Sequence, residues 1–109
     1  MSEEARLPAH VEVGGLLRRV QQEGGFATVI ARGEADAGTI MVVLADRTAP
    51  ARAFERMPQP DGTRAWTLSR AAAPDDPAAF QDWLGRRSLQ DRDLWIIELD
   101  VPRGERFIP

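Results

Sequence analysis

Residues 39–45 read Thr-Ile-Met-Val-Val-Leu-Ala, and this run constrains the fold more than any other part of the chain. Its β-branched residues favour a strand, and successive positions are apolar, so both faces of that strand must be covered. A strand of this kind belongs in the middle of a sheet. Residues 94–99 (LWIIEL) are apolar enough to form a second buried strand near the C-terminus.

A helix is predicted before the first strand, from the spacing of Val13, Leu16, Leu17 and Val20. Positions i, i+3, i+4 and i+7 place these four side chains on one stripe of a helix. The pair of glycines at positions 24 and 25 is expected to end this helix, because glycine adopts the left-handed conformation without a steric penalty.

Four strands are predicted to follow as an antiparallel meander, at residues 26–32, 39–45, 51–57 and 64–68. The first two suggest a hairpin closed by the loop between them. The segment MPQPDG supplies the prolines, aspartate and glycine of the turn before the fourth strand.

A second helix is predicted after this meander. Asp76 is suited to cap it, and Pro77 fits its first position, where no backbone donor is needed. Phe80, Trp83 and Leu84 form its apolar stripe. The order helix, four strands, helix and final strand predicts an α+β fold, with both helices mainly on one face of one sheet.

Length and composition predict a single α+β domain over residues 1–109, with flexible ends at 1–7 and 108–109. The chain is 43% hydrophobic and 28% charged, which is ordinary for a folded globular protein. It has no apolar stretch long enough for a membrane span and no secretory leader pattern, so we expect a cytoplasmic protein without membrane contact.

Two absences limit the chemistry available to the chain. It has no cysteine, and all 14 basic residues are arginine, so thiolate sites, a Walker lysine and Schiff-base chemistry are excluded. The only histidine is His10, which makes a catalytic triad or a histidine zinc site untenable. No cofactor, resident metal or catalytic residue is therefore predicted. The net charge of −3 makes nucleic acid an improbable partner.

The loop GEADAG, residues 33–38, is the first candidate ligand site. Its acids Glu34 and Asp36 can hold a divalent cation if a further carboxylate or water assists, and the loop glycines can turn backbone amides toward an anion. The alternative is a simple hairpin turn, in which glycine and aspartate serve to reach positive φ. The candidate ligand-binding residues are Arg32, Gly33, Glu34, Asp36, Gly38 and Arg56.

The arginine pairs of the two predicted helices form a second candidate. If the helices lie side by side, a guanidinium patch results that can grip phosphates or an acidic partner. This patch would consist of Arg18, Arg19, Arg86 and Arg87. Nearby acids argue against it, as does the scarcity of aromatic residues for base stacking.

Several short motifs resemble a small, mainly alphaproteobacterial family known as domain of unknown function 1491. They are LLRR, GGFATVIARG, DAG, FER, the lone Trp66 and DLWIIELD, and together they span about residues 7–107. One departure is Arg92, where the family pattern often has proline, so the turn there is expected to be less rigid. The resemblance implies a cytoplasmic single domain and transfers no catalytic residue, because the family's activity is not established.

Three functions remain open at this point. The leading hypothesis is a non-catalytic protein-interaction or regulatory module that forms a homodimer, whose third or fourth strand offers a free sheet edge. The alternative is a metal-assisted enzyme acting on a phosphate-bearing or otherwise anionic substrate at the GEADAG loop. The third is nucleic-acid binding through the helix arginines.

Overall fold

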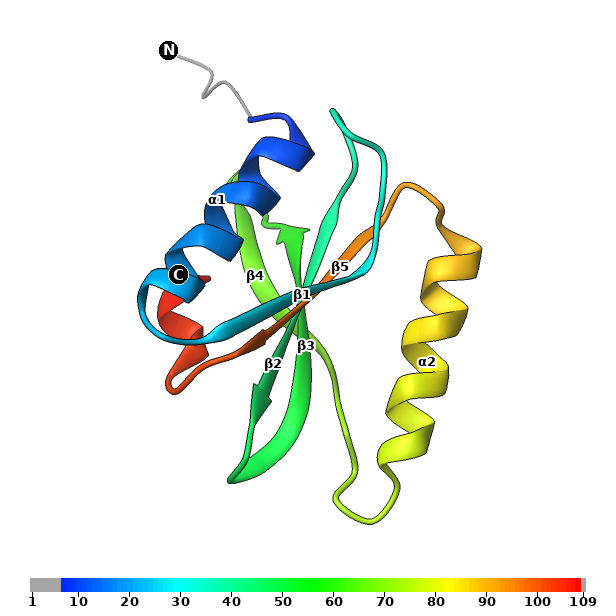
Figure 1. Ribbon diagram of the computed structural model, residues 1–109. Coiled ribbons are helices and arrows are strands. Elements are labelled where there is room, and N and C mark those ends of the chain that lie inside the picture. Colours follow the sequence, from blue (N-terminus) through cyan, green and yellow to red (C-terminus); the bar gives the residue numbers. More distant parts are fainter. Residues whose placement is uncertain (1–6, 109) are drawn as a thin grey trace.

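The computed structural model describes residues 7–108, in which two α-helices flank a five-stranded sheet (Figure 1). The elements in chain order are α1 (Ala9–Gln22), β1 (Phe26–Ala31), β2 (Ile40–Asp46), β3 (Ala49–Pro58), β4 (Arg64–Ala71), α2 (Pro77–Gln90), β5 (Trp95–Asp100) and the short 3-10 helix η1 (Gly104–Phe107). The α+β fold class and the order of elements are confirmed.

The strand order in the sheet is β1-β5-β2-β3-β4. The strands β2, β3 and β4 form three of the four strands of the predicted antiparallel meander. The predicted hairpin between β1 and β2 is wrong, because β5 lies between them, antiparallel to β1 and parallel to β2. Burial explains why β5, and not β1, lies beside β2. The strand β5 is apolar on both faces and takes an interior place, whereas alternate residues of β1 are exposed.

The two helices cover opposite faces of the sheet, so the prediction that both lie mainly on one face is wrong (Figure 1). Val13, Leu16 and Val20 of α1 pack with Val42 and Ile97 in what we call the α1-side core. Phe80 and Leu84 of α2 pack with Met41, Val43 and Ile96 in the α2-side core. Because β2 and β5 are apolar on both faces, a single covered face would have left half of their side chains in water.

Helix α1 ends as its glycines predict. The left-handed residue is Gly24, with φ of +83°. Its N–H donates to the carbonyl of Gln21, and the N–H of Gly25 donates to the carbonyl of Val20, both at 3.0 Å. These two bonds form a Schellman motif, which satisfies carbonyls that the helix end would otherwise leave unpaired.

Helix α2 begins as predicted. The side chain of Asp76 accepts a hydrogen bond from the N–H of Ala79 at 3.2 Å, and Pro77 occupies the first helical position. At the C-terminus, Ile108 was predicted to lie in a flexible end, but it is only 6% exposed and packs in the α1-side core with Phe107. The predicted flexibility of residues 1–6 and 109 falls outside the described residues.

We expect opposite effects from two glycine-to-alanine substitutions at α1. Gly24→Ala forces a side chain into the left-handed region and should lower the free energy of unfolding by about 1 kcal/mol. Gly14→Ala, inside the same helix with open space around its Cβ, should raise it by about 0.5–1 kcal/mol. Urea denaturation of both variants checks the pair, and equal effects would contradict the Schellman assignment.

Candidate functional site

The loop of residues 32–39, which joins β1 to β2, caps the N-terminus of α1. The N-cap residue of this helix is Pro8, which provides no side-chain acceptor. The carbonyls of Asp36 and Ala35 accept instead from the N–H groups of Ala9 and His10, at 3.0 and 2.8 Å. Nδ1 of His10 also lies 2.9 Å from the carbonyl of Ala35. The loop thus satisfies donors that every helix start leaves free.

Glu34 closes this loop on itself. Its carboxylate accepts hydrogen bonds from the backbone N–H groups of Asp36 and Ala37. Its carbonyl accepts from the indole N–H of Trp95 at 2.8 Å, which ties the loop to the start of β5. Among residues 7–108, no three histidine or acidic side chains gather where they could hold a metal ion.

The loop needs its two glycines because its backbone lies very close to the backbone of Asp93. A Cβ on Gly33 would lie 2.2 Å from the carbonyl oxygen of Asp93, and a Cβ on Gly38 would lie 2.4 Å from the same atom. Neither glycine has a positive φ, so the predicted reason for their presence is wrong. The loop rests directly on the backbone ahead of β5, and the N–H of Glu34 donates to the carbonyl of Asp93 at 3.1 Å.

The predicted ligand-binding residues are only partly brought together. A small cavity of about 150 Å³ is lined by Asp36, Gly38 and Arg56, among others, but not by Glu34 or Arg32. Arg56 forms an ion pair with Glu12 at 2.7 Å and stacks 5.0 Å from the centre of the Trp66 ring. Its charge is therefore balanced within the protein. Arg32 lies apart, over the ring of Trp95 at 5.3 Å.

The predicted arginine patch does not form, because α1 and α2 lie on opposite faces of the sheet. Arg18 and Arg19 therefore stand on one side of the molecule, and Arg86 and Arg87 on the other. Arg87 is also engaged: it makes two hydrogen bonds of 2.8 Å to the carboxylate of Glu55 on β3. The hypothesis of nucleic-acid binding required these four arginines on one surface, and they are not on one surface.

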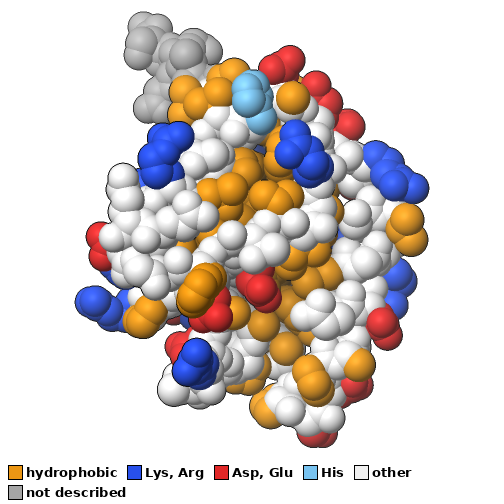
Figure 2. Space-filling model, in the orientation of Figure 1, with side chains coloured by type: hydrophobic (Ala, Val, Ile, Leu, Met, Phe, Trp, Pro, Cys, Tyr) orange, Lys and Arg blue, Asp and Glu red, His pale blue; other side chains and the backbone are white. Residues whose placement is uncertain are grey.

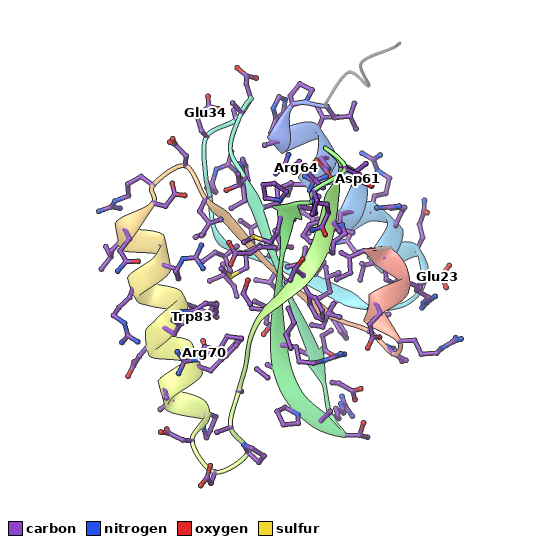
Figure 3. All side chains as sticks on the ribbon, turned by 180° about the vertical axis from the view of Figure 1, so that it is seen from behind. Glu23, Glu34, Asp61, Arg64, Arg70 and Trp83 are labelled. Atoms are coloured by element: carbon purple, nitrogen blue, oxygen red, sulfur yellow. The ribbon has the colours of Figure 1, made fainter. Side chains whose placement is uncertain are left out.

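Glu55 holds α2 to the meander. The hydrogen bonds from Arg87 keep the pKa of the Glu55 carboxyl below its usual value of 4.5, against the effect of partial burial. Ser69 on β4 adds a further hydrogen bond of 2.6 Å. Trp83 of α2 lies beside this group, with Arg70 of β4 at 5.5 Å from the centre of its ring (Figure 3).

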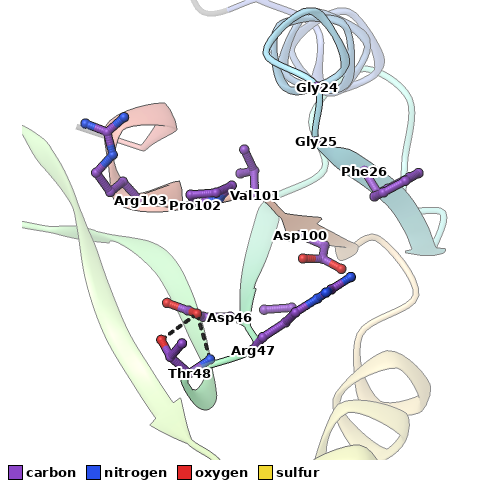
Figure 4. Close-up of a pocket in the computed structure, with 11 residues that line it drawn as sticks. Gly24, Gly25, Phe26, Asp46, Arg47, Thr48, Asp100, Val101, Pro102 and Arg103 are labelled. Atoms are coloured by element: carbon purple, nitrogen blue, oxygen red, sulfur yellow. Dashed lines mark hydrogen bonds between the residues drawn. The ribbon is translucent and has the colours of Figure 1, made fainter.

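A cleft of about 570 Å³ lies at the end of the sheet where the parallel strands β2 and β5 finish (Figure 4). It is lined by residues 24–26, 45–48 and 100–103. Two hydrogen bonds from Thr48 occupy Asp46 and hold the pKa of that carboxyl below its usual range. The side chains of Arg47 and Asp100 point toward one another across the cleft in Figure 4. Sequence reasoning missed this cleft, because only the strand order brings the three segments together.

The free edges of the sheet are β1 and β4, seen from the two sides in Figures 1 and 3. The sequence predicted an edge at the third or fourth strand. The fourth is indeed an edge, but the third, β3, lies between two neighbours. Along β1, Phe26 is 72% exposed and Ile30 is 44% exposed. Hydrophobic side chains gather in the middle of this face of the molecule, between the two helices (Figure 2).

These features define a small α+β protein with a mixed sheet, one helix on each face and an apolar strand at one edge. None of the helices in the part of the chain that the structure describes is long or apolar enough to span a bilayer. The family model described as "Protein of unknown function (DUF1491)" matches residues 7–109, and the chain belongs to this family. The resemblance found in the sequence is thereby confirmed.

Solved structures of the family share the fold. A crystal structure of a DUF1491 family protein from Caulobacter crescentus CB15 is 33% identical, with a TM-score of 0.79 over 94% of each chain. An NMR structure from the same organism, also 33% identical, has a TM-score of 0.76 over 94% of this chain and 92% of that one. The solution structure of protein Atu0922 from A. tumefaciens is 26% identical, with a TM-score of 0.73 over 95% and 93%. Among curated proteins, none matches this chain.

Replacing Gly33 by alanine tests the close approach of the loop to β5. The added methyl group meets backbone atoms that cannot move aside, so Gly33→Ala should lower the free energy of unfolding by about 2–3 kcal/mol. Gly85→Ala, in α2 with nothing near its Cβ, is the matched control and should not destabilise the protein. Thermal unfolding compares them, and a Gly33→Ala variant as stable as the control would contradict the packing described.

The free energy of unfolding, measured at decreasing pH, tests the ion pair formed by Glu55 and Arg87. A carboxyl whose pKa is lowered by folding stabilises the protein above its unfolded pKa and loses this contribution as the pH falls through the folded pKa. Glu55→Gln should therefore cost about 1–3 kcal/mol at pH 7, and the deficit should shrink below about pH 4.5. Urea denaturation at several pH values measures it.

Glu98→Gln is the matched control, because Glu98 pairs with no arginine among residues 7–108. It should change stability by less than about 0.5 kcal/mol. A deficit in Glu55→Gln that stays constant from neutral to acid pH would show that the ion pair does not lower the pKa.

Proposed function

We propose that this protein is a non-catalytic protein-interaction module whose working surface is the free edge of β1. The observation that carries the proposal is the composition of this strand: FATVIA contains neither a charge nor a proline. Natural edge strands are normally protected by such residues, because their unpaired backbone groups can pair with another chain. An edge without them is suited to accept an added strand.

The opposite edge is different in character. The strand β4 carries Arg64 at its start and Arg70 near its end. The last five residues of this strand are all exposed. Charges of this kind discourage pairing between sheet edges. The contrast between the two edges favours β1 as the surface that has been left open.

The chemistry of β1 also indicates its occupant. We expect an extended segment of another polypeptide, uncharged over about five residues and rich in β-branched or aromatic side chains. Backbone hydrogen bonds would supply affinity, and the exposed side chains of Phe26 and Ile30 would select apolar partners on the same face.

A neutral strand probe tests this proposal. The probe is an acetylated and amidated octapeptide of alternating threonine and valine, and its control carries proline in place of a central valine, which removes a backbone donor. Titration of the labelled protein, followed by backbone amide NMR, should shift signals of β1 with the first peptide and not with the second.

Thr28→Lys and Thr67→Lys are the matched protein variants, since both positions are exposed and each lies on one of the two edge strands. Only Thr28→Lys should weaken binding of the octapeptide, by a factor of about ten. Shifts confined to β4, or no shift at millimolar peptide, would refute the proposed surface.

A further inference from the structure

We infer that the strand received by the β1 edge is β1 of a second copy of this chain, paired antiparallel about a two-fold axis at Thr28. The inference rests on the proposed function and names its partner. Two copies joined in this way would share one continuous sheet, in which the order β4-β3-β2-β5-β1 of one copy continues into β1 of the other.

Symmetry restricts the registers that are possible. A two-fold axis perpendicular to the sheet keeps each face of the sheet on the same side, so directly opposite residues must share a face. Ala27 and Val29 pack in the α1-side core. Strand alternation therefore places Phe26 and Thr28 on the α2 side. At the bulge, Ile30 and Ala31 together oppose Ile96, and Ala31 packs against the α2-side core, which puts Ile30 on that side as well.

Among the allowed registers, one centred on Thr28 pairs the exposed apolar side chains with each other. It sets Phe26 of each copy opposite Ile30 of the other, and Thr28 opposite Thr28. Pairs of an aromatic with a β-branched residue, and pairs of threonines, are both favourable across antiparallel strands. A register centred on Val29 sets Phe26 against Arg32, and one centred on Ala27 sets Ile30 against Gly24, so each leaves an apolar side chain without a partner.

The charges at the two ends of β1 are complementary in the same arrangement. Glu23 precedes the strand, is exposed and makes a long ion pair of 3.4 Å with Arg106, and the exposed Arg32 follows the strand. Antiparallel pairing brings the Arg32 end of one copy beside the Glu23 end of the other, whereas the strand between them is uncharged. Opposite ends thus attract, although each chain has a net charge of −3.

The irregular pairing near Ile30 limits the strength of this interface. The register of β1 against β5 shifts between Val29 and Ala31, so the regular part of the strand is short. A bulge of this kind bends an edge strand and shortens the ladder that it can offer. We therefore expect a reversible dimer whose population depends on protein concentration.

Single-cysteine variants test the register, because the natural chain contains no cysteine. In Thr28→Cys the two thiols should face each other with Cα atoms about 4.5–5.5 Å apart, within the range of about 4.4–6.8 Å that a disulfide needs. Air oxidation, with oxygen accepting the electrons and protons of the two thiols, should give a covalent dimer. Thr67→Cys on the β4 edge is the control and should cross-link at least about tenfold more slowly.

A mixed experiment fixes the register independently. Phe26→Cys and Ile30→Cys should each cross-link poorly alone and efficiently when the two variants are combined, because the register places position 26 opposite position 30. Efficient cross-linking of either variant with itself would overturn the register centred on Thr28.

Sedimentation of the unmodified protein completes the test. It should show a concentration-dependent dimer, and Thr28→Lys should raise the dissociation constant at least about tenfold, because two like charges would then be directly opposite. A wild-type protein that stays monomeric at millimolar concentration overturns the self-pairing. If the octapeptide still binds β1 in that case, the proposed function stands; if it does not, both fail.

Discussion

The parallel pairing of β2 with β5 is the interaction on which the rest of the structure depends. Both strands are buried along most of their length, with Met41 through Val43 and the Ile96–Ile97 pair fully inaccessible to water. Burial of both faces requires a cover on each, and this is why α1 and α2 occupy opposite sides. The same pairing inserts β5 between β2 and β1, which moves β1 to the edge of the sheet.

The acidic loop between β1 and β2 follows from this insertion. Because β5 separates the two strands, the connection must cross the start of β5, and Gly33 and Gly38 allow it to lie against the backbone of Asp93. Once there, its carbonyls cap a helix that begins at a proline and has no side-chain cap of its own. The acids that resembled a ligand site in the sequence are thus placed by structural needs, with the carboxylate of Glu34 engaged by its own loop.

The sequence predicted both helices, because the stripe of Val13, Leu16 and Val20 and the cap at Asp76 are local signals. It did not predict the strand order, since hydrophobic periodicity reports how deeply a strand is buried and not which strand lies beside it. The predicted arginine patch is wrong for a related reason. It required both helices on one face of the sheet, and periodicity within a helix does not report which face the helix covers. The uncharged composition of FATVIA was visible in the sequence, but its significance depends on β1 being an edge, which only the topology provides.

Strand addition at β1, by a partner or by a second copy, requires that the outer backbone groups of this strand are open. Residue-by-residue hydrogen exchange of the amides from Phe26 to Ala31, measured by NMR at low and high protein concentration, tests it most directly. We expect the amides pointing away from β5 to exchange quickly in dilute solution and to become protected as concentration rises, while those bonded to β5 are protected throughout. Strong protection of every β1 amide in dilute solution would contradict the open edge, whereas outward amides that exchange quickly at all concentrations would contradict only the pairing of two copies.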